Sequence, residues 1–298
     1  MELSYIKTLK DLVAIADGES VYKPTPSRNG NIFKLPSAKV TVDLNNKGLA
    51  QGTFPILLAK KIHVESILAE LFWFLAGGTN VKFLQDLGVK IWDNWADEKG
   101  DLGPIYGAQF RSATDHGVDQ YRQVVEGLID DRFSRRHVIT MWSPSQLHEM
   151  ALPPCHGTAI VFSVTRKEDG DYLNMTTTQR SADWYLGVPF NLTSYYLLLT
   201  ITAQLTGLKV GELDYSFANV HLYENQLPAA RRYLASAECM RSTLDSPEKH
   251  YPRLGVLFNS MEFLVPFITE TVDREVLTEL VKFEDRFPSP VIPAPVSV

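Results

Sequence analysis

Cysteine is scarce in this sequence. Its 298 residues include only two, Cys155 and Cys239, which are too few for a disulfide scaffold and are typical of a reducing compartment. We therefore expect a cytoplasmic protein, in a host cytoplasm if the source is viral. The metal-binding spacings CxxC and HExxH do not occur, and His156 directly after Cys155 is poorly spaced for a shared ion. We expect no metal cofactor.

An excess of positive charge is also lacking. The formal net charge is −6, whereas surfaces that bind nucleic acid carry excess lysine and arginine to neutralise phosphates. We expect no nucleic-acid partner, and any anionic ligand has to meet a local cluster of arginines. The longest apolar stretch, 192–208, contains six Ser, Thr and Gln residues and so favours a buried helix over a membrane span.

Hydrophobic patterning predicts a mixture of helices and strands. The first 20 residues have the pattern of an amphipathic helix rather than a secretion signal, and the glycine pair that ends the segment 62–78 suits a helix stop. β-Branched and aromatic residues mark the expected strands. The expected strands are 137–142, 157–164, 172–179 and 214–223; the later helices are 192–206 and a segment from Pro228 onward; a loop is expected at 24–30.

This order of elements predicts the fold class. Strands and helices mix without a regular βαβ alternation, and no GxGxxG is present. The pattern favours an α+β sheet with helices on one face over a doubly wound nucleotide-binding fold. No repeat, low-complexity tract or long linker divides the chain, so we expect a single domain over residues 1–298.

Cys155 is the first candidate for chemistry. It lies in ALPPCHG, between a proline-rich loop and an expected strand. A lone cysteine is most often a small buried hydrophobe, but nearby positive charge lowers the pKa of a thiol and makes it a nucleophile. Arg135, Arg136 and Arg180 lie in short segments that flank the expected sheet, although adjacent arginines are also common on solvated surfaces.

Glu70 is the second candidate. It lies inside ILAELFWFL, and its neighbours at helical spacing are Ile67, Trp73 and Phe74. A carboxyl group on an apolar face has a raised pKa and can exchange protons near neutrality, which suits a general acid or base. The alternative is a carboxylate that escapes at the helix edge and pairs with a lysine.

The sequence contains an ordered set of motifs: SRR at 134–136, PPCH at 153–156, QRSAD at 179–183, LGVPFN at 186–191, HLY at 221–223 and the C-terminal APVSV, together with ELFWFL, IWDNWAD and DLGPIYG. In order and spacing this set resembles the thymidylate synthase family from about residue 28 to the C-terminus. The resemblance implies a homodimer of α+β subunits that pack sheet to sheet, each with a mixed, mainly antiparallel sheet and helices on one face. It also implies that the protein binds dUMP and 5,10-methylenetetrahydrofolate.

The resemblance also implies catalytic roles. Cys155 would add to C6 of uracil, which turns C5 into an enolate able to attack the folate iminium. Arg180 would lie close to the thiolate and favour its ionised form. Glu70 would act through water on O4 and the iminium, and Tyr106 would assist proton removal from C5.

Binding roles follow from the same motifs. Asn191 would read the pyrimidine edge by accepting from N3 and donating to O4, a pattern that cytosine reverses. Arginine forks suit phosphate oxygens, and Arg135 and Arg136 would reach across from the other subunit. The implied nucleotide-binding residues are Arg28, Arg135, Arg136, Gln179, Arg180, Ser181 and Asn191, with His221 and Tyr223 at the sugar; the implied folate-binding residues are Trp92, Trp95, Asp183, Gly187 and Val298, the last closing as a lid.

The sequence departs from the family pattern near the HLY strand, where Ala218 and Asn219 replace a Gly-Asp pair. Three functions stay open. Hydride transfer from tetrahydrofolate gives dTMP and dihydrofolate, the thymidylate synthase reaction, whereas water capture of the same intermediate gives 5-hydroxymethyl-dUMP and tetrahydrofolate, the dUMP hydroxymethylase reaction. A non-catalytic nucleotide- or RNA-binding relative is the third, although its nucleophile would be expected to be lost.

Overall fold

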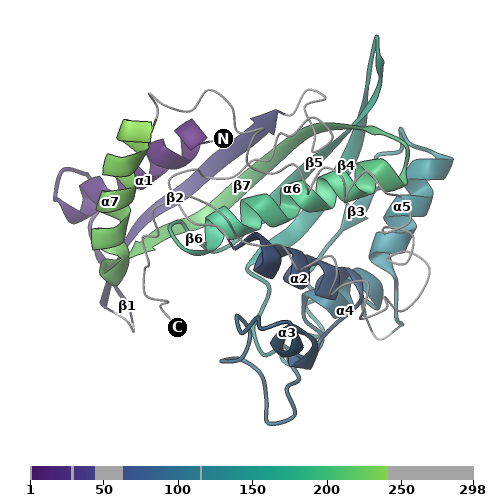
Figure 1. Ribbon diagram of the computed structural model, residues 1–298, viewed down its shortest axis with the longest axis horizontal. Helices are drawn as coiled ribbons and strands as arrows, with labels where there is room; N and C mark the ends of the chain where they lie inside the picture. Colours follow the sequence, from purple (N-terminus) through teal and green to yellow (C-terminus); the bar gives the residue numbers. More distant parts are fainter. Residues whose placement is uncertain (1, 28–29, 44–62, 115, 241–298) are drawn as a thin grey trace.

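The computed structural model describes residues 2–27, 30–43, 63–114 and 116–240, and is built around one mixed sheet (Figure 1). The strand order is β1-β2-β7-β5-β4-β3, with β6 paired to β7. The β5·β7 and β6·β7 pairs are parallel and the other four are antiparallel. The strands are β1 (Thr25–Ser27), β2 (Gly30–Asp43), β3 (Val138–Ile139), β4 (His156–Lys167), β5 (Gly170–Gln179), β6 (Ala182–Asp183) and β7 (Lys209–Tyr223).

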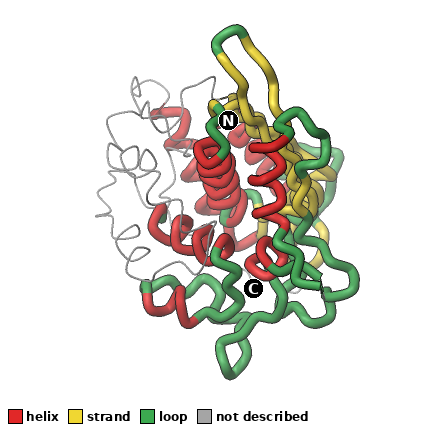
Figure 2. The backbone as a smooth tube through the Cα atoms, turned by 90° about the vertical axis from the view of Figure 1, so that its right-hand side faces the viewer, coloured by secondary structure: helices red, strands yellow, loops and turns green. Residues whose placement is uncertain are grey.

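Helices cover one side of this sheet, as Figure 2 shows with the strands seen close to edge-on. Helix α6 packs on β7 and β5, and α1 packs on β2 and β7. The long α6 is buried on almost every side, which explains why its sequence is apolar all round. The helices are α1 (Glu2–Ala16), α2 (Val64–Leu75), α3 (Lys82–Asp86), α4 (Tyr106–Arg111), α5 (Gln120–Asp130), α6 (Gly187–Leu205), the 3₁₀ turn η2 (Glu224–Gln226) and α7 (Leu227–Met240).

The architecture therefore matches the predicted α+β class with a mixed, mainly antiparallel sheet. Among the described residues, no helix is both long and apolar enough to cross a bilayer. The predicted stop of α2 is confirmed, because Gly77 follows the last turn with φ +78° and the Gly78 N–H donates to the Trp73 carbonyl at 2.8 Å. A left-handed residue at this place is how many helices end.

Several element boundaries differ from the prediction, and β7, for example, begins at Lys209 rather than at 214. Helix α6 begins at Gly187, five residues before the predicted start, because Pro189 lies in its first turn, where a missing N–H costs nothing. The strand predicted over 137–142 has only two residues in ladder pairing. The loop expected at 24–30 contains the short strand β1 and leads into β2, a long strand that we did not predict. In β2, Pro36 interrupts the alternation of the buried residues Phe33, Val40 and Val42.

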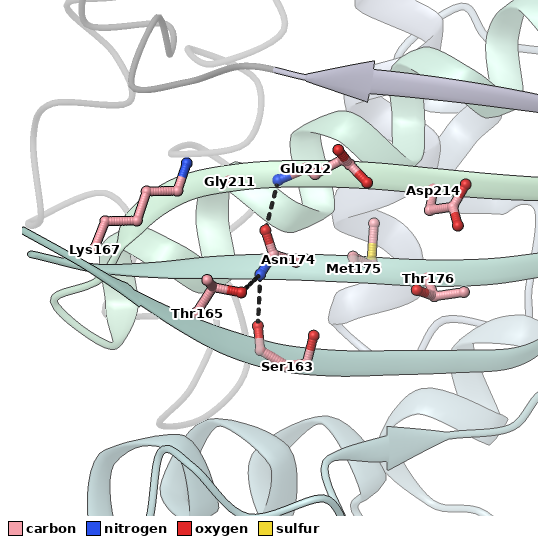
Figure 3. A pocket seen from close by; sticks show the side chains of 9 residues that line it. All are labelled: Ser163, Thr165, Lys167, Asn174, Met175, Thr176, Gly211, Glu212 and Asp214. Atoms are coloured by element: carbon pink, nitrogen blue, oxygen red, sulfur yellow. Dashed lines mark hydrogen bonds between the residues drawn. The ribbon is translucent and has the colours of Figure 1, made fainter.

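The other face of the sheet carries polar and charged side chains, among them Thr165, Lys167 and Glu212, around a hollow of about 380 Å³ (Figure 3). The hollow lies at a bulge where Gly211 and Glu212 of β7 stand opposite Asn174 of β5. The Asn174 Oδ1 accepts from the Glu212 N–H at 2.9 Å. A Cβ at position 211 would lie 2.2 Å from this oxygen, so the bulge needs glycine there.

Candidate active site

The register of the sheet joins the two segments that carry the main candidates. His156 at the start of β4 pairs with Gln179 at the end of β5, and the Arg180 N–H donates to the Cys155 carbonyl at 2.9 Å. Asp183 of β6 pairs with His221 of β7. Residues from PPCH, QRSAD and HLY, far apart in the sequence, thus meet at one end of the sheet.

Arg180 holds the loop around Cys155. Its Nε donates to the Pro154 carbonyl at 2.8 Å and its Nη2 to the Pro153 carbonyl at 2.9 Å, while Nη2 lies 3.9 Å from the Cys155 Sγ. Burial raises the pKa of the half-buried Cys155 thiol, and the Arg180 charge opposes this rise without cancelling it. The thiol pKa is therefore raised rather than lowered as expected, although Arg180 acts in the expected direction.

Tyr106 contacts the backbone of the nucleophile candidate. Its hydroxyl oxygen accepts the Cys155 N–H at 2.8 Å, and its ring stacks on His156 with centroids 4.4 Å apart. Burial raises the pKa of Tyr106 well above its ordinary value, so the hydroxyl keeps its proton at neutral pH. A protonated phenol at this place can pass a proton but does not carry a charge.

His156 and Tyr195 belong to the same cluster, and we did not predict either as a site residue. The His156 Nδ1 lies 2.9 Å from the Tyr195 hydroxyl. Burial lowers the pKa of His156 to about 3, which keeps the imidazole neutral. The position of His156 directly after Cys155 was an available signal, whereas Tyr195, in the middle of an apolar helix, gave none.

Glu70 and Trp92 form a direct pair. The indole Nε1 of Trp92 donates to the Glu70 Oε1 at 2.8 Å. Burial raises the pKa of Glu70 to about 7, against a smaller lowering by the Trp92 hydrogen bond. This agrees with the prediction of a carboxyl group that exchanges protons near neutrality; among the described contacts its partner is an indole rather than a lysine. The Trp92 ring packs edge-on against Trp95 and Tyr106, with centroids 5.8 and 5.9 Å away.

Asn191 on the first turns of α6 is fixed by Gln179. Its Nδ2 donates to the Gln179 Oε1 at 3.2 Å, and the Gln179 Nε2 donates to the Ser181 carbonyl at 2.8 Å. A Cβ on Gly187, one turn earlier, would lie 4.0 Å from the Asn191 Nδ2. This part of the site is a chain of amides with one defined direction.

Asn219 ties two further candidates together. It has a left-handed backbone with φ +46°, its Nδ2 donates to the Arg180 carbonyl at 2.9 Å, and its carbonyl accepts from the His221 Nδ1 at 2.7 Å. A carbonyl only accepts, so Nδ1 of His221 carries the hydrogen and Nε2 of the neutral ring has a lone pair to offer a hydroxyl. Asparagine tolerates this backbone region better than most residues. Asn219, one of the two residues that depart from the family pattern, is thus part of the hydrogen-bond network that joins Arg180 to His221.

Asp183 is held at the edge of the same region. Its Oδ1 accepts from the Leu186 N–H and its Oδ2 from the Gln226 Nε2, both at 2.9 Å. If Gly187 carried a Cβ, that atom would lie 3.8 Å from the Asp183 Cβ, which shows how close Asp183 and Gly187 are. The aromatic ring of Tyr223 lies perpendicular to that of His221 at 5.2 Å. Two predicted folate residues and two predicted sugar residues therefore lie near the Asn191 end of the cluster.

Some predicted residues are not joined to this cluster. Arg135 and Arg136 are exposed in the connection between α5 and β3. Arg28 and Val298 lie outside the described residues. Within the described ranges no group of three or more His, Cys, Asp or Glu side chains is placed to hold a metal ion.

The thymidylate synthase family model matches residues 8–260 of this chain. The match covers most of the sequence, and the chain belongs to the thymidylate synthase family. This is a family of folate-dependent pyrimidine methyltransferases that bind dUMP, use methylenetetrahydrofolate as co-substrate and serve nucleotide biosynthesis.

Proposed function

We propose that the protein is a thymidylate synthase, which converts dUMP and 5,10-methylenetetrahydrofolate to dTMP and dihydrofolate through a covalent adduct on Cys155. The observation that carries this proposal is the Cys155 thiol, half-buried beside the Arg180 guanidinium at 3.9 Å and backed by the Tyr106 hydroxyl. A nucleophile, a cation and a proton carrier at one end of the sheet suit addition to an electron-poor ring.

The covalent step starts from the thiolate. Its sulfur forms a bond to C6 of uracil, and the electron pair of the C5–C6 double bond moves toward O4 as an enolate. Burial raises the thiol pKa, so ionisation depends on cations. The phosphate of bound dUMP adds negative charge close to the thiolate, so cations have to balance both anions. We propose that Arg28, Ser181 and the partner's copies of Arg135 and Arg136 join Arg180 around the phosphate.

Proton transfers fall to Glu70 and Tyr106. With a pKa of about 7, Glu70 is present in both protonation states at neutral pH, and can protonate the developing enolate at O4 through water and take the proton back. Tyr106 stays protonated and lies next to the backbone of the nucleophile, a position suited to assisting removal of the C5 proton.

Recognition of the nucleotide rests on the amide of Asn191. Its Nδ2 faces Gln179 with one hydrogen, which leaves the second hydrogen and the Oδ1 to donate to O4 and accept from N3 of uracil. His221 and Tyr223 would bind the 3′-hydroxyl, with Nε2 of His221 as the acceptor. Cytosine would place its N4 amino donor against the amide donor and its N3 acceptor against the amide oxygen, so neither hydrogen bond would form.

The choice of hydride transfer over water capture is supported by the wall beside Glu70. Trp92 is 7% exposed and packs against Trp73, Phe74, Trp95 and Tyr106. An aromatic wall suits the flat pterin ring, which Asp183, Gly187 and Trp95 would also contact, and it excludes water from the exocyclic methylene. Val298 would complete this exclusion as a lid.

The same proposal includes a homodimer packed sheet to sheet and a cytoplasmic setting. On the sheet face away from the helices, the register aligns one residue from each of five strands: Thr41, Asp214, Thr176, Val161 and Val138. Val138 is 44% exposed in the single chain. Such a row of small side chains suits close contact with a second copy.

Product analysis tests the proposal. The protein is incubated with dUMP and methylenetetrahydrofolate, the nucleotide is identified by mass spectrometry and dihydrofolate is followed by absorbance. A methyl product with an equal amount of dihydrofolate is expected. A hydroxymethyl product with tetrahydrofolate would replace the proposal with the hydroxymethylase reaction, and no new nucleotide would support the non-catalytic reading.

A further inference from the structure

A buried hydrogen-bond chain leads from β7 to the amide that reads the base. The Tyr215 hydroxyl donates to the Gln179 Oε1 at 3.0 Å, and the same oxygen accepts the Asn191 Nδ2 at 3.2 Å. Tyr215 is 0% exposed and Gln179 is 3% exposed. Water therefore cannot replace either partner easily.

The partners at the two ends of the Gln179 amide fix the direction of every hydrogen bond in this network. The Ser181 carbonyl only accepts, so the Nε2 of Gln179 has to face it, at 2.8 Å. The Oε1 then faces Tyr215 and Asn191 and accepts from both. Because Oε1 only accepts, Asn191 has to turn its Nδ2 toward Gln179, and this decides which edge of its amide remains for a ligand.

Tyr215 is held rigidly as a donor. Its ring stacks on Phe217 with centroids 4.3 Å apart and packs edge-on against Tyr195 at 5.1 Å. Burial raises its pKa well above the ordinary value, so the hydroxyl hydrogen is present at all pH values near neutrality. A phenol fixed by two rings loses little freedom when it donates to Gln179.

We propose that Tyr215 is a positioning residue for base selection: its hydroxyl locks the Gln179 amide, which locks Asn191 in the orientation that matches uracil and opposes cytosine. This inference rests on the proposed function, because it assumes that Asn191 faces the pyrimidine. An Asn191 amide turned over by 180° would present the reverse pattern, which matches cytosine. The selectivity of Asn191 thus depends on groups that do not touch the nucleotide.

The test is the Tyr215→Phe variant, which keeps the ring and removes only the hydroxyl. Dissociation constants for dUMP and dCMP are measured by titration calorimetry on the full chain. The ratio between them is expected to fall roughly fivefold to tenfold, in line with the net worth of one hydrogen bond. It does not invert, because the Ser181 carbonyl still opposes a flipped Gln179.

Tyr121→Phe is the matched control, because it also removes one hydroxyl from a buried tyrosine, 3.2 Å from the Thr202 Oγ1 on another part of α6. The control is expected to keep the unmodified dUMP/dCMP ratio. A Tyr215→Phe ratio equal to that of the control would overturn the inference. If the unmodified protein fails to prefer dUMP, the proposed function itself fails, and the inference falls with it.

Discussion

Ionised Glu70 lowers the free energy of unfolding, and a single substitution can measure by how much. Burial raises its pKa from 4.5 to about 7, so the folded state holds a proton that the unfolded chain releases. A group with a raised pKa contributes fully to stability below its unfolded pKa, and this contribution is lost as the pH rises through the folded pKa. The destabilisation by Glu70 therefore builds up as the pH rises from about 4.5 to about 7, and it is complete above that.

The size of this effect follows from the two pKa values. They differ by about 2.5 pH units, and each unit corresponds to about 1.36 kcal/mol, which gives about 3 kcal/mol. Glu70→Gln removes the charge and keeps an oxygen that can accept from Trp92. We expect the variant to match the unmodified protein near pH 4 and to exceed its free energy of unfolding by about 1 to 3 kcal/mol at pH 8, while losing most turnover.

Urea unfolding from pH 4 to pH 8 measures this difference. Glu126→Gln is the control, because Glu126 is an exposed carboxylate paired with Arg122 on α5, and its removal should give no gain at pH 8. A Glu70→Gln effect that is the same at every pH would refute the reasoning, since a constant difference reflects packing rather than ionisation.

Three further predictions concern the site itself. Cys155→Ala should abolish turnover and keep dUMP binding within about threefold by calorimetry; a variant that still turns over would exclude the covalent mechanism. Asn191→Asp should shift the ratio of kcat/KM toward dCMP, measured with both nucleotides, and an unchanged uracil preference would disprove the assignment of the base-reading amide. Asn219→Gly, which keeps the left-handed backbone and loses the bond to the Arg180 carbonyl, should raise KM for dUMP severalfold with a small loss of stability, whereas Asn219→Ala should also lower the free energy of unfolding by about 1 kcal/mol from backbone strain. Equal stability of the Gly and Ala variants would contradict this.

Local patterns in the sequence predicted part of the fold. The glycine pair 77–78 marked the end of α2, and the apolar stretch from 192 marked α6, because both signals are local. The start of α6 and the strand β2 were missed because Pro189 and Pro36 resemble breaks, while one lies in a first helical turn and the other on an exposed strand position.

The site was predictable where the chemical role of a residue follows from its type and its neighbours in the sequence. Glu70 on an apolar helix face indicated a raised pKa without any tertiary information. The contact of Arg180 with Cys155 depends on the pairing of His156 with Gln179, and the role of Tyr215 depends on its register beside β5. Such long-range pairings leave no trace in local composition, and the buried environment that raises the Cys155 pKa leaves none either.

Trapping with 5-fluoro-dUMP and methylenetetrahydrofolate tests the covalent role of Cys155 most directly. Fluorine at C5 cannot leave as a cation, so the reaction should stop after the sulfur has bonded to C6 and the methylene to C5. Intact-protein mass spectrometry under denaturing conditions should then find a gain equal to one nucleotide plus one folate, absent in Cys155→Ala. An unmodified mass in the unmodified protein, or the same gain in the alanine variant, would contradict attack by Cys155.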